Sequence, residues 1–158
     1  SLSLSLSLKM FVHAHIMPHI NFASTLWDGC SDVHLLKLNS LYRRAAKLIL
    51  HESHMSTDMK LNSLKFLPLK THLAYNKAVF MFKTVHGDVP KYVHSYFTHV
   101  TKRYGSHNLL PPIPRIDLYK SSFAFSGSSL WNSLPIEIKL STSLKAFKRR
   151  VLTHLMTI

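Results

Sequence analysis

The spacing of apolar side chains over residues 32–50 constrains this chain more than any other feature. These side chains recur every three or four positions, at Leu35, Leu38, Tyr42, Ala45 and Ile49. A 3.6-residue period predicts an amphipathic helix that buries this stripe, and Ser31 or Asp32 is suited to cap its start. Basic side chains occupy the opposite side of the helix or its edge: Lys37, Arg44, Lys47 and, at the edge, Arg43.

A second amphipathic helix is predicted over residues 142–156, with Ser141 or Ser143 as its cap. Its apolar stripe consists of Leu144, Phe147, Val151 and Leu155. Three basic side chains face away from this stripe, and a fourth flanks it with an aliphatic stem that can lie over apolar surface. They are Lys145, Arg149, Arg150 and, at the flank, Lys148. Both helices therefore carry a basic face.

Between them, residues 68–86 predict a helix that is apolar around most of its circumference. A helix of this kind packs against neighbours on several sides, so we expect it at the centre of the fold. Pro68 suits its first turn, and Gly87 suits the left-handed residue that ends it. Pro90 opens a short helix to about residue 97.

Proline divides the helical segments near both ends of the chain. Residues 10–23 predict a helix that Pro18 kinks or restarts, and Pro135 ends a brief helix over residues 122–132. Residues 51–65 are polar and predict a loop or a short turn.

The predicted fold is mainly α: an irregular helical bundle of five or six helices, with room for one small β-hairpin around residues 98–120. We assign residues 10–158 to a single domain. Residues 1–9 begin with a Ser-Leu pair repeated four times. Its strict alternation favours an extended conformation, and we interpret it as a low-complexity lead-in at the ragged edge of a longer reading frame.

Charge narrows the classes of partner. The chain has 158 residues, with 20 Lys and Arg against 7 Asp and Glu, and a formal net charge of +13. Its 46% hydrophobic content argues against a disordered basic tail. A basic domain of this kind most often meets nucleic acid, less often an anionic membrane surface; the alternative is a solvated charge excess without a partner. No apolar run reaches the ~20 residues needed to span a bilayer.

Residues that could carry chemistry do not assemble into a known site. His15 and His19 have helical ligand spacing, but Pro18 lies between them and no third ligand is near in sequence. Cys30 and His34 could pair as nucleophile and base, yet a lone cysteine near a helix start is more often structural. We therefore expect no catalytic residue, no metal and no cofactor. The single cysteine excludes an intrachain disulfide, which favours a reducing compartment, nuclear or cytoplasmic.

Four segments of the chain, 15–30, 38–49, 67–93 and 129–150, share a pattern with a known family. The first, third and fourth combine helix-ending prolines or glycines with aromatic residues, and the second is a leucine-rich helix with an Arg-Arg-Ala-Ala-Lys run. The positions that carry the pattern are Pro18, Trp27, Gly29, Pro68, Gly87, Pro90, Trp131, Asn132, Pro135 and Phe147. In this order the segments resemble the C-terminal region of LINE-type (non-LTR) retrotransposon reverse transcriptases. The Leu-Trp-Asn-Ser-Leu-Pro string at residues 130–135 is the most specific part.

The resemblance implies the thumb and following C-terminal part of the polymerase, a helical bundle that grips the template-primer. The family's endonuclease and its palm, with the Tyr-x-Asp-Asp motif, have no counterpart in this chain, so no catalytic aspartate is carried over. The chain also departs from the family in its Ser-Leu repeat, which fits a degenerate or mis-framed copy. Some relatives end in a cysteine-histidine knuckle. This chain lacks one, because Cys30 is its single cysteine.

The implied partner is an RNA or DNA backbone, bound without strong sequence preference, together with the palm of the polymerase. No membrane partner is expected. The residues expected to contact nucleic acid are Lys37, Arg43, Arg44, Lys47, Lys145, Lys148, Arg149 and Arg150. Two alternatives stay open: a non-functional translated retroelement remnant, and a helical protein-interaction module.

Overall fold

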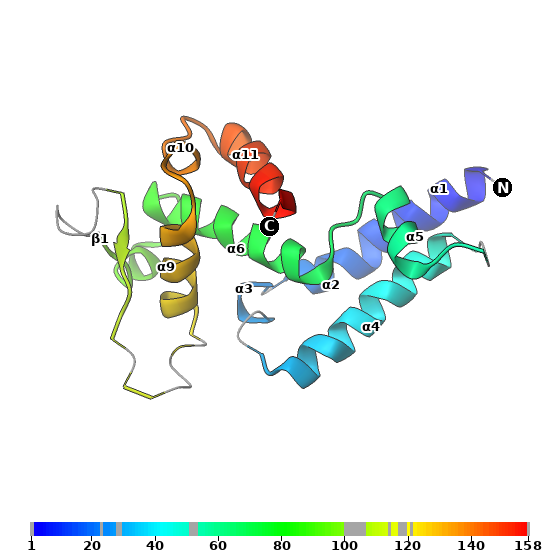
Figure 1. Ribbon diagram of the computed structural model, residues 1–158, viewed down its shortest axis with the longest axis horizontal. Coiled ribbons are helices and arrows are strands. Elements are labelled where there is room, and N and C mark those ends of the chain that lie inside the picture. Colours follow the sequence, from blue (N-terminus) through cyan, green and yellow to red (C-terminus); the bar gives the residue numbers. More distant parts are fainter. Residues whose placement is uncertain are drawn as a thin grey trace. The chain divides into compact units, whose positions relative to one another are not determined.

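The computed structural model describes residues 2–22, 24–27, 30–50, 54–99, 107–113, 115–116, 120 and 122–157 (Figure 1). Most of these residues are helical, which confirms the mainly α prediction. Contacts divide the chain into two compact units, Ser1–Leu73 and Ala74–Ile158. The sequence placed residues 10–158 in a single domain, whereas the apolar side chains collect in two clusters, one within each unit. We describe each unit by itself.

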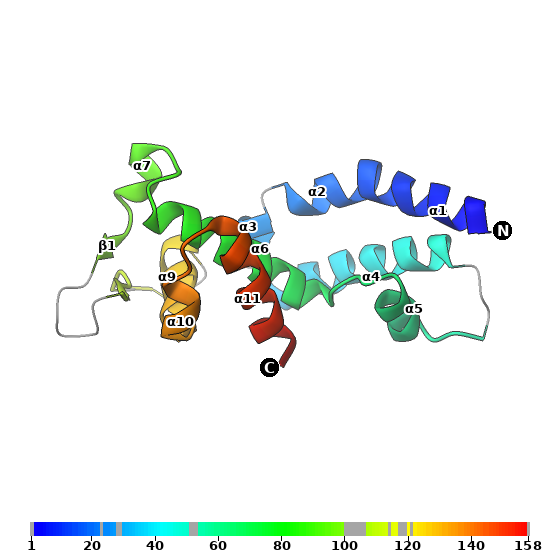
Figure 2. The same cartoon turned by 90° about the horizontal axis from the view of Figure 1, so that it is seen from above.

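The first unit is built from short helices around one long one. In chain order they are α1 (Leu2–Phe11), the π-helical turn η1 (Val12–Ile16), α2 (Met17–Asn21), α3 (Ser24–Trp27), α4 (Asp32–Ile49), α5 (Thr57–Ser63) and the start of α6 (Leu69–Val85). Both α1 and η1 contact α4, and Figure 2 shows the α1–α2 run lying along it. The unit's core therefore lies between α4 and its neighbours.

The Ser-Leu repeat is helical, so the expectation of an extended lead-in was wrong. It forms most of α1, which runs from Leu2 to Phe11. Leucine is a strong helix former, and Leu8 packs against the buried cluster of the first unit. Helix propensity and this tertiary contact outweigh the two-residue alternation.

Pro18 restarts the helix, as predicted. It occupies the first turn of α2, where its missing amide hydrogen is not needed. The preceding turn, Val12–Ile16, widens into a π-helix. Val12, Met17 and Ile20 are nevertheless buried, so the chain keeps one apolar side toward the core through this irregular stretch.

The predicted helix over residues 32–50 is confirmed as α4, Asp32–Ile49. Tyr42, Ala45 and Ile49 are buried, and the two leucines of the stripe pack partly buried against the same cluster. Ser31 occupies the cap position rather than Asp32. Its hydroxyl lies 2.7 Å from Nδ1 of His34.

Residues 51–65 contain a helix that the sequence analysis missed. Ser56 caps α5 by accepting a hydrogen bond from the amide of Met59, at 3.3 Å. Leu61 and Leu64 are buried, which anchors this polar segment to the core. The helix forms because one cap and two buried leucines outweigh its polar composition.

The second unit contains the rest of α6, α7 (Lys91–His94), β1 (Thr98–His99), β2 (Leu109–Leu110), α9 (Phe123–Ser133), α10 (Ile136–Lys139) and α11 (Leu144–Thr157). The strands pair antiparallel, with Thr98 opposite Leu110, inside the range predicted for a hairpin. Four-residue helices that were not predicted, such as α3 and α10, raise the number of helices above the five or six expected.

The ends of α6 follow the predicted residues closely. Pro68 precedes the helix instead of lying in its first turn, and its carbonyl accepts the first helical hydrogen bond, from His72 at 2.9 Å. Gly87 has a φ of 80°. The amide of Gly87 donates to the carbonyl of Thr84, and the amide of Asp88 donates to the carbonyl of Lys83. This pair of hydrogen bonds is the Schellman motif, in which a left-handed residue ends a helix. After Pro90, α7 ends at His94, earlier than predicted.

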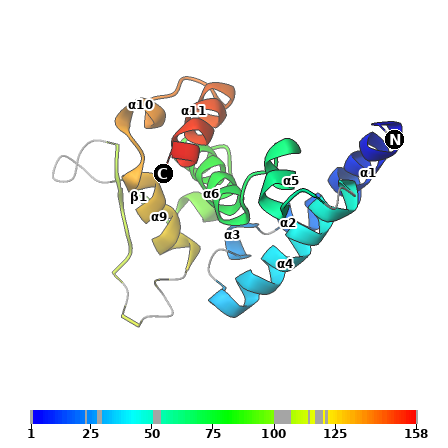
Figure 3. The ribbon, with the colours of Figure 1, turned by 45° about the vertical axis from the view of Figure 1, so that its right-hand side comes forward.

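Aromatic rings form the core of the second unit. The ring centroids of Phe82 and Phe147 are 4.4 Å apart, and those of Trp131 and Phe147 are 6.0 Å apart. Figure 3 shows α6 beside α11 in this unit. A Cβ added at Gly127 would lie 2.8 Å from Sδ of Met81, so α9 approaches α6 closely because residue 127 has no side chain.

A lysine is buried between α6 and α9. Lys77 of α6 is 3% exposed, and its Nζ donates to Oγ of Ser126 in α9 at 3.1 Å. Burial penalises the ammonium form and lowers the pKa of Lys77 to about 8.

This buried lysine predicts a pH-dependent stability. Between pH 8 and 10 the unfolded chain, whose lysine titrates near 10.5, holds more protons at this position than the folded chain. The free energy of unfolding should therefore rise with pH in this window. Below pH 8 the folded chain should bear the full cost of burying a charged Lys77 side chain. Lys77→Met should flatten the rise, whereas the exposed-site control Lys91→Met should retain it. Urea titrations at each pH measure the effect; equal slopes in both variants would contradict it.

Candidate nucleic-acid interface

The basic residues of α4 lie where the sequence placed them. Lys37, Arg44 and Lys47 are all exposed, while Tyr42 and Ala45 of the same helix are buried. The helix therefore turns its apolar stripe inward and leaves these three cations in solvent.

Arg43 differs from the other cations of α4. Its Nη1 forms an ion pair with Oδ1 of Asp58 in α5, at 2.8 Å. The side chains are 39% and 73% exposed, so water screens the pair, and its contribution to stability is about 0–1 kcal/mol. Asp58 offsets part of the charge that Arg43 could offer to a phosphate.

The predicted helix over residues 142–156 is confirmed as α11, which Ser143 caps through a 3.2 Å bond from the amide of Ala146. Lys145, Lys148 and Arg149 are exposed. Arg150 is exposed as well, but its Nη1 also donates to the carbonyl of Glu137 at 2.9 Å. All four predicted cations therefore reach solvent, and Arg150 additionally ties α11 to α10.

These two basic faces belong to different units, α4 to the first and α11 to the second. We therefore treat them as two separate candidate surfaces. The ion pair between Arg43 and Asp58 is the only one found within the described ranges of the chain. Within those same ranges, the remaining cations of both faces have no acidic partner.

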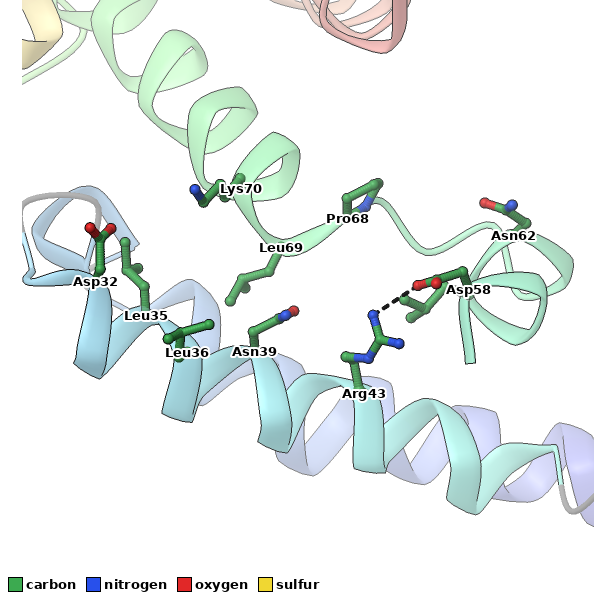
Figure 4. A pocket seen from close by; sticks show the side chains of 11 residues that line it. Asp32, Leu35, Leu36, Asn39, Arg43, Asp58, Asn62, Pro68, Leu69 and Lys70 are labelled. Carbon is green, nitrogen blue, oxygen red and sulfur yellow. Dashed lines mark hydrogen bonds and ion pairs between the residues drawn. The ribbon is translucent and has the colours of Figure 1, made fainter. Parts of the chain in front are cut away.

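The first unit also contains a cleft that the sequence analysis did not predict. Its volume is about 710 Å³, and its walls come from α4, α5 and the start of α6 (Figure 4). We call it the α4–α5 cleft. Leu36, Asn39 and Arg43 of this cleft also border a smaller cavity of about 380 Å³, the basic hollow, which Arg44 and Lys47 line. The cleft was missed because its α5 wall was predicted as a loop.

Two residues of the Leu-Trp-Asn-Ser-Leu-Pro string have structural roles. Trp131 is 2% exposed, and its Nε1 donates to the carbonyl of His107 at 2.9 Å. Asn132 bonds the backbone of Leu109 twice, accepting from its amide and donating to its carbonyl, each at 2.8 Å. Together they fasten residues 107–109 to α9, far along the chain.

Lys139 completes this arrangement. Its Nζ donates to Oδ1 of Asn108 at 2.8 Å and to the carbonyl of Asn132 at 3.1 Å. Burial lowers the pKa of Lys139 from its ordinary value. The lysine thus satisfies a carbonyl near the end of α9 and cannot reach a distant ligand without breaking these bonds.

The other motif positions mark element boundaries or the core. Pro135 caps α10, and Phe147 is completely buried. Trp27 ends α3, but its side chain lies outside the described residues, as does Gly29 altogether.

Both residue pairs that could carry chemistry, His15 with His19 and Cys30 with His34, lie in the first unit. His15 lies in η1 with its ring 4.6 Å from that of Phe11, while His19 lies in α2. His34 has Ser31 as the hydrogen-bond partner of its Nδ1. No group of three or more potential metal ligands occurs among the residues the structure describes. In the same residues, no helix is both long and apolar enough to cross a bilayer.

Comparisons with protein-family models, with curated proteins and with solved structures found no significant match to this chain.

The Asn132 bonds predict a measurable loss of stability on substitution. Asn132→Asp keeps an acceptor for the Leu109 amide but replaces the donor to the Leu109 carbonyl with a carboxylate oxygen. The free energy of unfolding should fall by about 1–3 kcal/mol, the cost of a buried unsatisfied group. Asn62→Asp, at an exposed position, serves as the control. Urea denaturation measures both; a loss no larger than that of the control would contradict the role of Asn132.

Proposed function

We propose that this chain is the nucleic-acid-binding thumb and C-terminal region of a LINE-type retrotransposon reverse transcriptase, without catalytic activity of its own. The observation that carries the proposal is the exposure of cations on two long amphipathic helices. Lys37, Arg44 and Lys47 stand out from α4, and Lys145, Lys148 and Arg149 from α11.

Cations in this setting favour a polyanionic partner. Each Lys or Arg that neutralises a phosphate releases condensed counterions, so a row of exposed cations binds a backbone without reading its sequence. A net charge of +13 also attracts nucleic acid through long-range electrostatics. The mainly α fold and the resemblance to the polymerase thumb support the same partner.

The proposed chemistry is binding alone. In the resembled family the metal-binding aspartates belong to the palm, and no equivalent motif occurs in this sequence. The basic helices would hold the backbone of a template-primer while the palm performs the polymerisation. Magnesium-dependent primer extension by the purified chain would overturn this division of roles.

Charge reversal on α4 tests the binding. The triple variant Lys37→Glu, Arg44→Glu, Lys47→Glu should bind a 20-base-pair duplex more weakly. It should also flatten the slope of log affinity against log salt by about 0.9 for each phosphate that the variant no longer neutralises. The fold should persist, because all three side chains lie off the apolar stripe. Fluorescence anisotropy over a salt series measures the slope, and circular dichroism checks the helix content.

A matched control carries the same change in net charge at scattered positions. Lys65, Lys91 and Arg115 are exposed and lie outside both basic helices, so their replacement by Glu should lower affinity only modestly and leave the slope nearly unchanged. If the control and the α4 variant behave alike, only overall charge matters and the α4 face is solvated surface. The corresponding variant of α11, at Lys145, Lys148 and Arg149, tests the second face in the same way.

A second candidate function, a helical protein-interaction module, is favoured by the apolar side chains exposed on α4. Val33, Leu36, Leu41 and Leu48 are each 57–68% exposed. Four apolar side chains exposed on one helix are typical of a surface that another protein covers, such as a polymerase palm.

These exposed apolar side chains of α4 predict self-association of the isolated chain. Without a covering partner, the wild-type protein should form concentration-dependent oligomers in light scattering. Leu41→Gln together with Leu48→Gln should reduce them. The matched replacement Ile113→Gln with Met156→Gln changes exposed apolar residues outside α4 and should not. A wild-type chain that stays monomeric at high concentration would contradict this second function and leave the nucleic-acid proposal intact.

A further inference from the structure

The α4–α5 cleft has the size and lining of a ligand site. Its volume of about 710 Å³ falls within the roughly 300–1,000 Å³ of small-molecule pockets. Among the residues that line it, Leu61 and Leu69 are buried and Leu35 is half-buried. Figure 4 shows Leu69 reaching from the start of α6 toward Leu36 and Asn39 of α4. The interior is therefore apolar and formed by leucines rather than aromatic rings.

Two amides line this apolar cleft. Asn39 of α4 is half-buried and Asn62 of α5 is exposed, and both border the cleft. In the part of the chain that the structure describes, neither side-chain amide has a hydrogen bond to another protein group. An amide has both donors and acceptors, which suits the edge of a nucleobase.

The charges around the cleft balance. Asp32 and Asp58 line it together with Arg43 and Lys70. Since the acids and the bases are equal in number, the cleft itself does not favour an anion. Its chemistry suits an uncharged group with a flat apolar face and polar edges.

The basic hollow next to the cleft has the opposite character. It shares Leu36, Asn39 and Arg43 with the cleft and adds Ser40, Arg44 and Lys47. Two exposed cations and a hydroxyl are suited to phosphate oxygens. A neutral site and a cationic site therefore adjoin along α4. A nucleotide likewise has an uncharged base next to an anionic phosphate.

We infer that the α4–α5 cleft receives one unstacked base of a single-stranded nucleic acid, while Arg44 and Lys47 in the basic hollow hold an adjacent phosphate. The inference rests on the proposed nucleic-acid binding and adds a preference for strands whose bases can leave the stack. A duplex keeps its bases paired, so the cleft discriminates in favour of single strands.

The test compares a base-bearing strand with an abasic strand of equal length and phosphate number. The probes are fluorescein-labelled 12-mers of deoxyadenylate, one intact and one with its central six bases removed. The intact strand should bind about tenfold more tightly at low salt, a modest ratio because leucines, not aromatic rings, contact the base. This affinity ratio cancels the phosphate contribution that both strands share.

Two leucines of α4 give a matched pair of variants. Leu36 lines the cleft and Leu41 does not, and both are more than half exposed, so neither replacement should unfold the chain. Leu36→Gln should bring the affinity ratio close to one, and Leu41→Gln should leave it near ten. If the Asn39 amide contacts the base edge, the wild-type chain should bind deoxyadenylate, deoxycytidylate and deoxythymidylate strands with different affinities. Asn39→Leu, which keeps the cations and the approximate volume, should remove these differences, and equal wild-type affinities would contradict the amide contact.

The outcomes separate this inference from the proposed function. Salt-dependent binding of all strands with a wild-type ratio of one would overturn the base site and leave backbone binding standing. A ratio of ten that Leu36→Gln does not change would place the base contacts elsewhere and also overturn the inference. If Leu36→Gln instead alters only the oligomer mass in light scattering, a second copy of the chain occupies the cleft, which overturns the inference as well. No binding of any strand at low salt would overturn both proposals.

Discussion

The candidate interface of the first unit depends on one buried hydroxyl. Tyr42 is 1% exposed at the middle of α4, and its Oη donates to the carbonyl of Leu67 at 2.8 Å. Burial raises the pKa of Tyr42 to about 12, so the hydroxyl stays a donor across the physiological range. The bond joins α4 to the chain immediately before α6, and those two segments are walls of the cleft. The same packing turns Lys37, Arg44 and Lys47 away from the core.

In the second unit a side-chain amide takes the place of a strand. Asn132 bonds both backbone groups of Leu109, as a neighbouring strand would, and Trp131 holds His107 beside it. The two-residue pair of β1 and β2 is too short to be stable by itself. The hydrogen bonds from Trp131 and Asn132 of α9 supply this support, so both residues have a structural role in holding the segment.

The sequence predicted the elements whose signals are local and missed those that depend on distant partners. The helices α4 and α11 follow from apolar periodicity, and Gly87 from the need for a positive φ at a helix end. The Ser-Leu repeat misled because alternation says nothing about the contact of Leu8 with the core. The α5 wall of the cleft needed Ser56 to be recognised as a cap. The bonds between Asn132 and Leu109 span 23 residues, and no periodicity indicates them.

The candidate binding residues show the same difference between local signals and contacts with distant elements. Exposure of the α4 and α11 cations could be predicted from their positions on each helix. The pairing of Arg43 with Asp58, and the tie from Arg150 to Glu137, could not, because each joins two elements whose packing is not encoded locally. Asn39 and Asn62 line the same cavity for the same reason: α4 and α5 pack on each other, so residues 23 positions apart border one cleft.

The close approach of α9 to α6 at Gly127 allows the oxidation of one methionine to report on the packing of these two helices. Met81 is completely buried with its sulfur against this glycine, whereas Met10, Met59 and Met156 are more than half exposed. A peroxide reaches exposed thioethers directly, whereas the sulfur of Met81 is shielded from solvent while α9 packs on α6. Oxidation of Met81 therefore records how often α9 separates from α6, on a timescale set by that opening and not by the reagent.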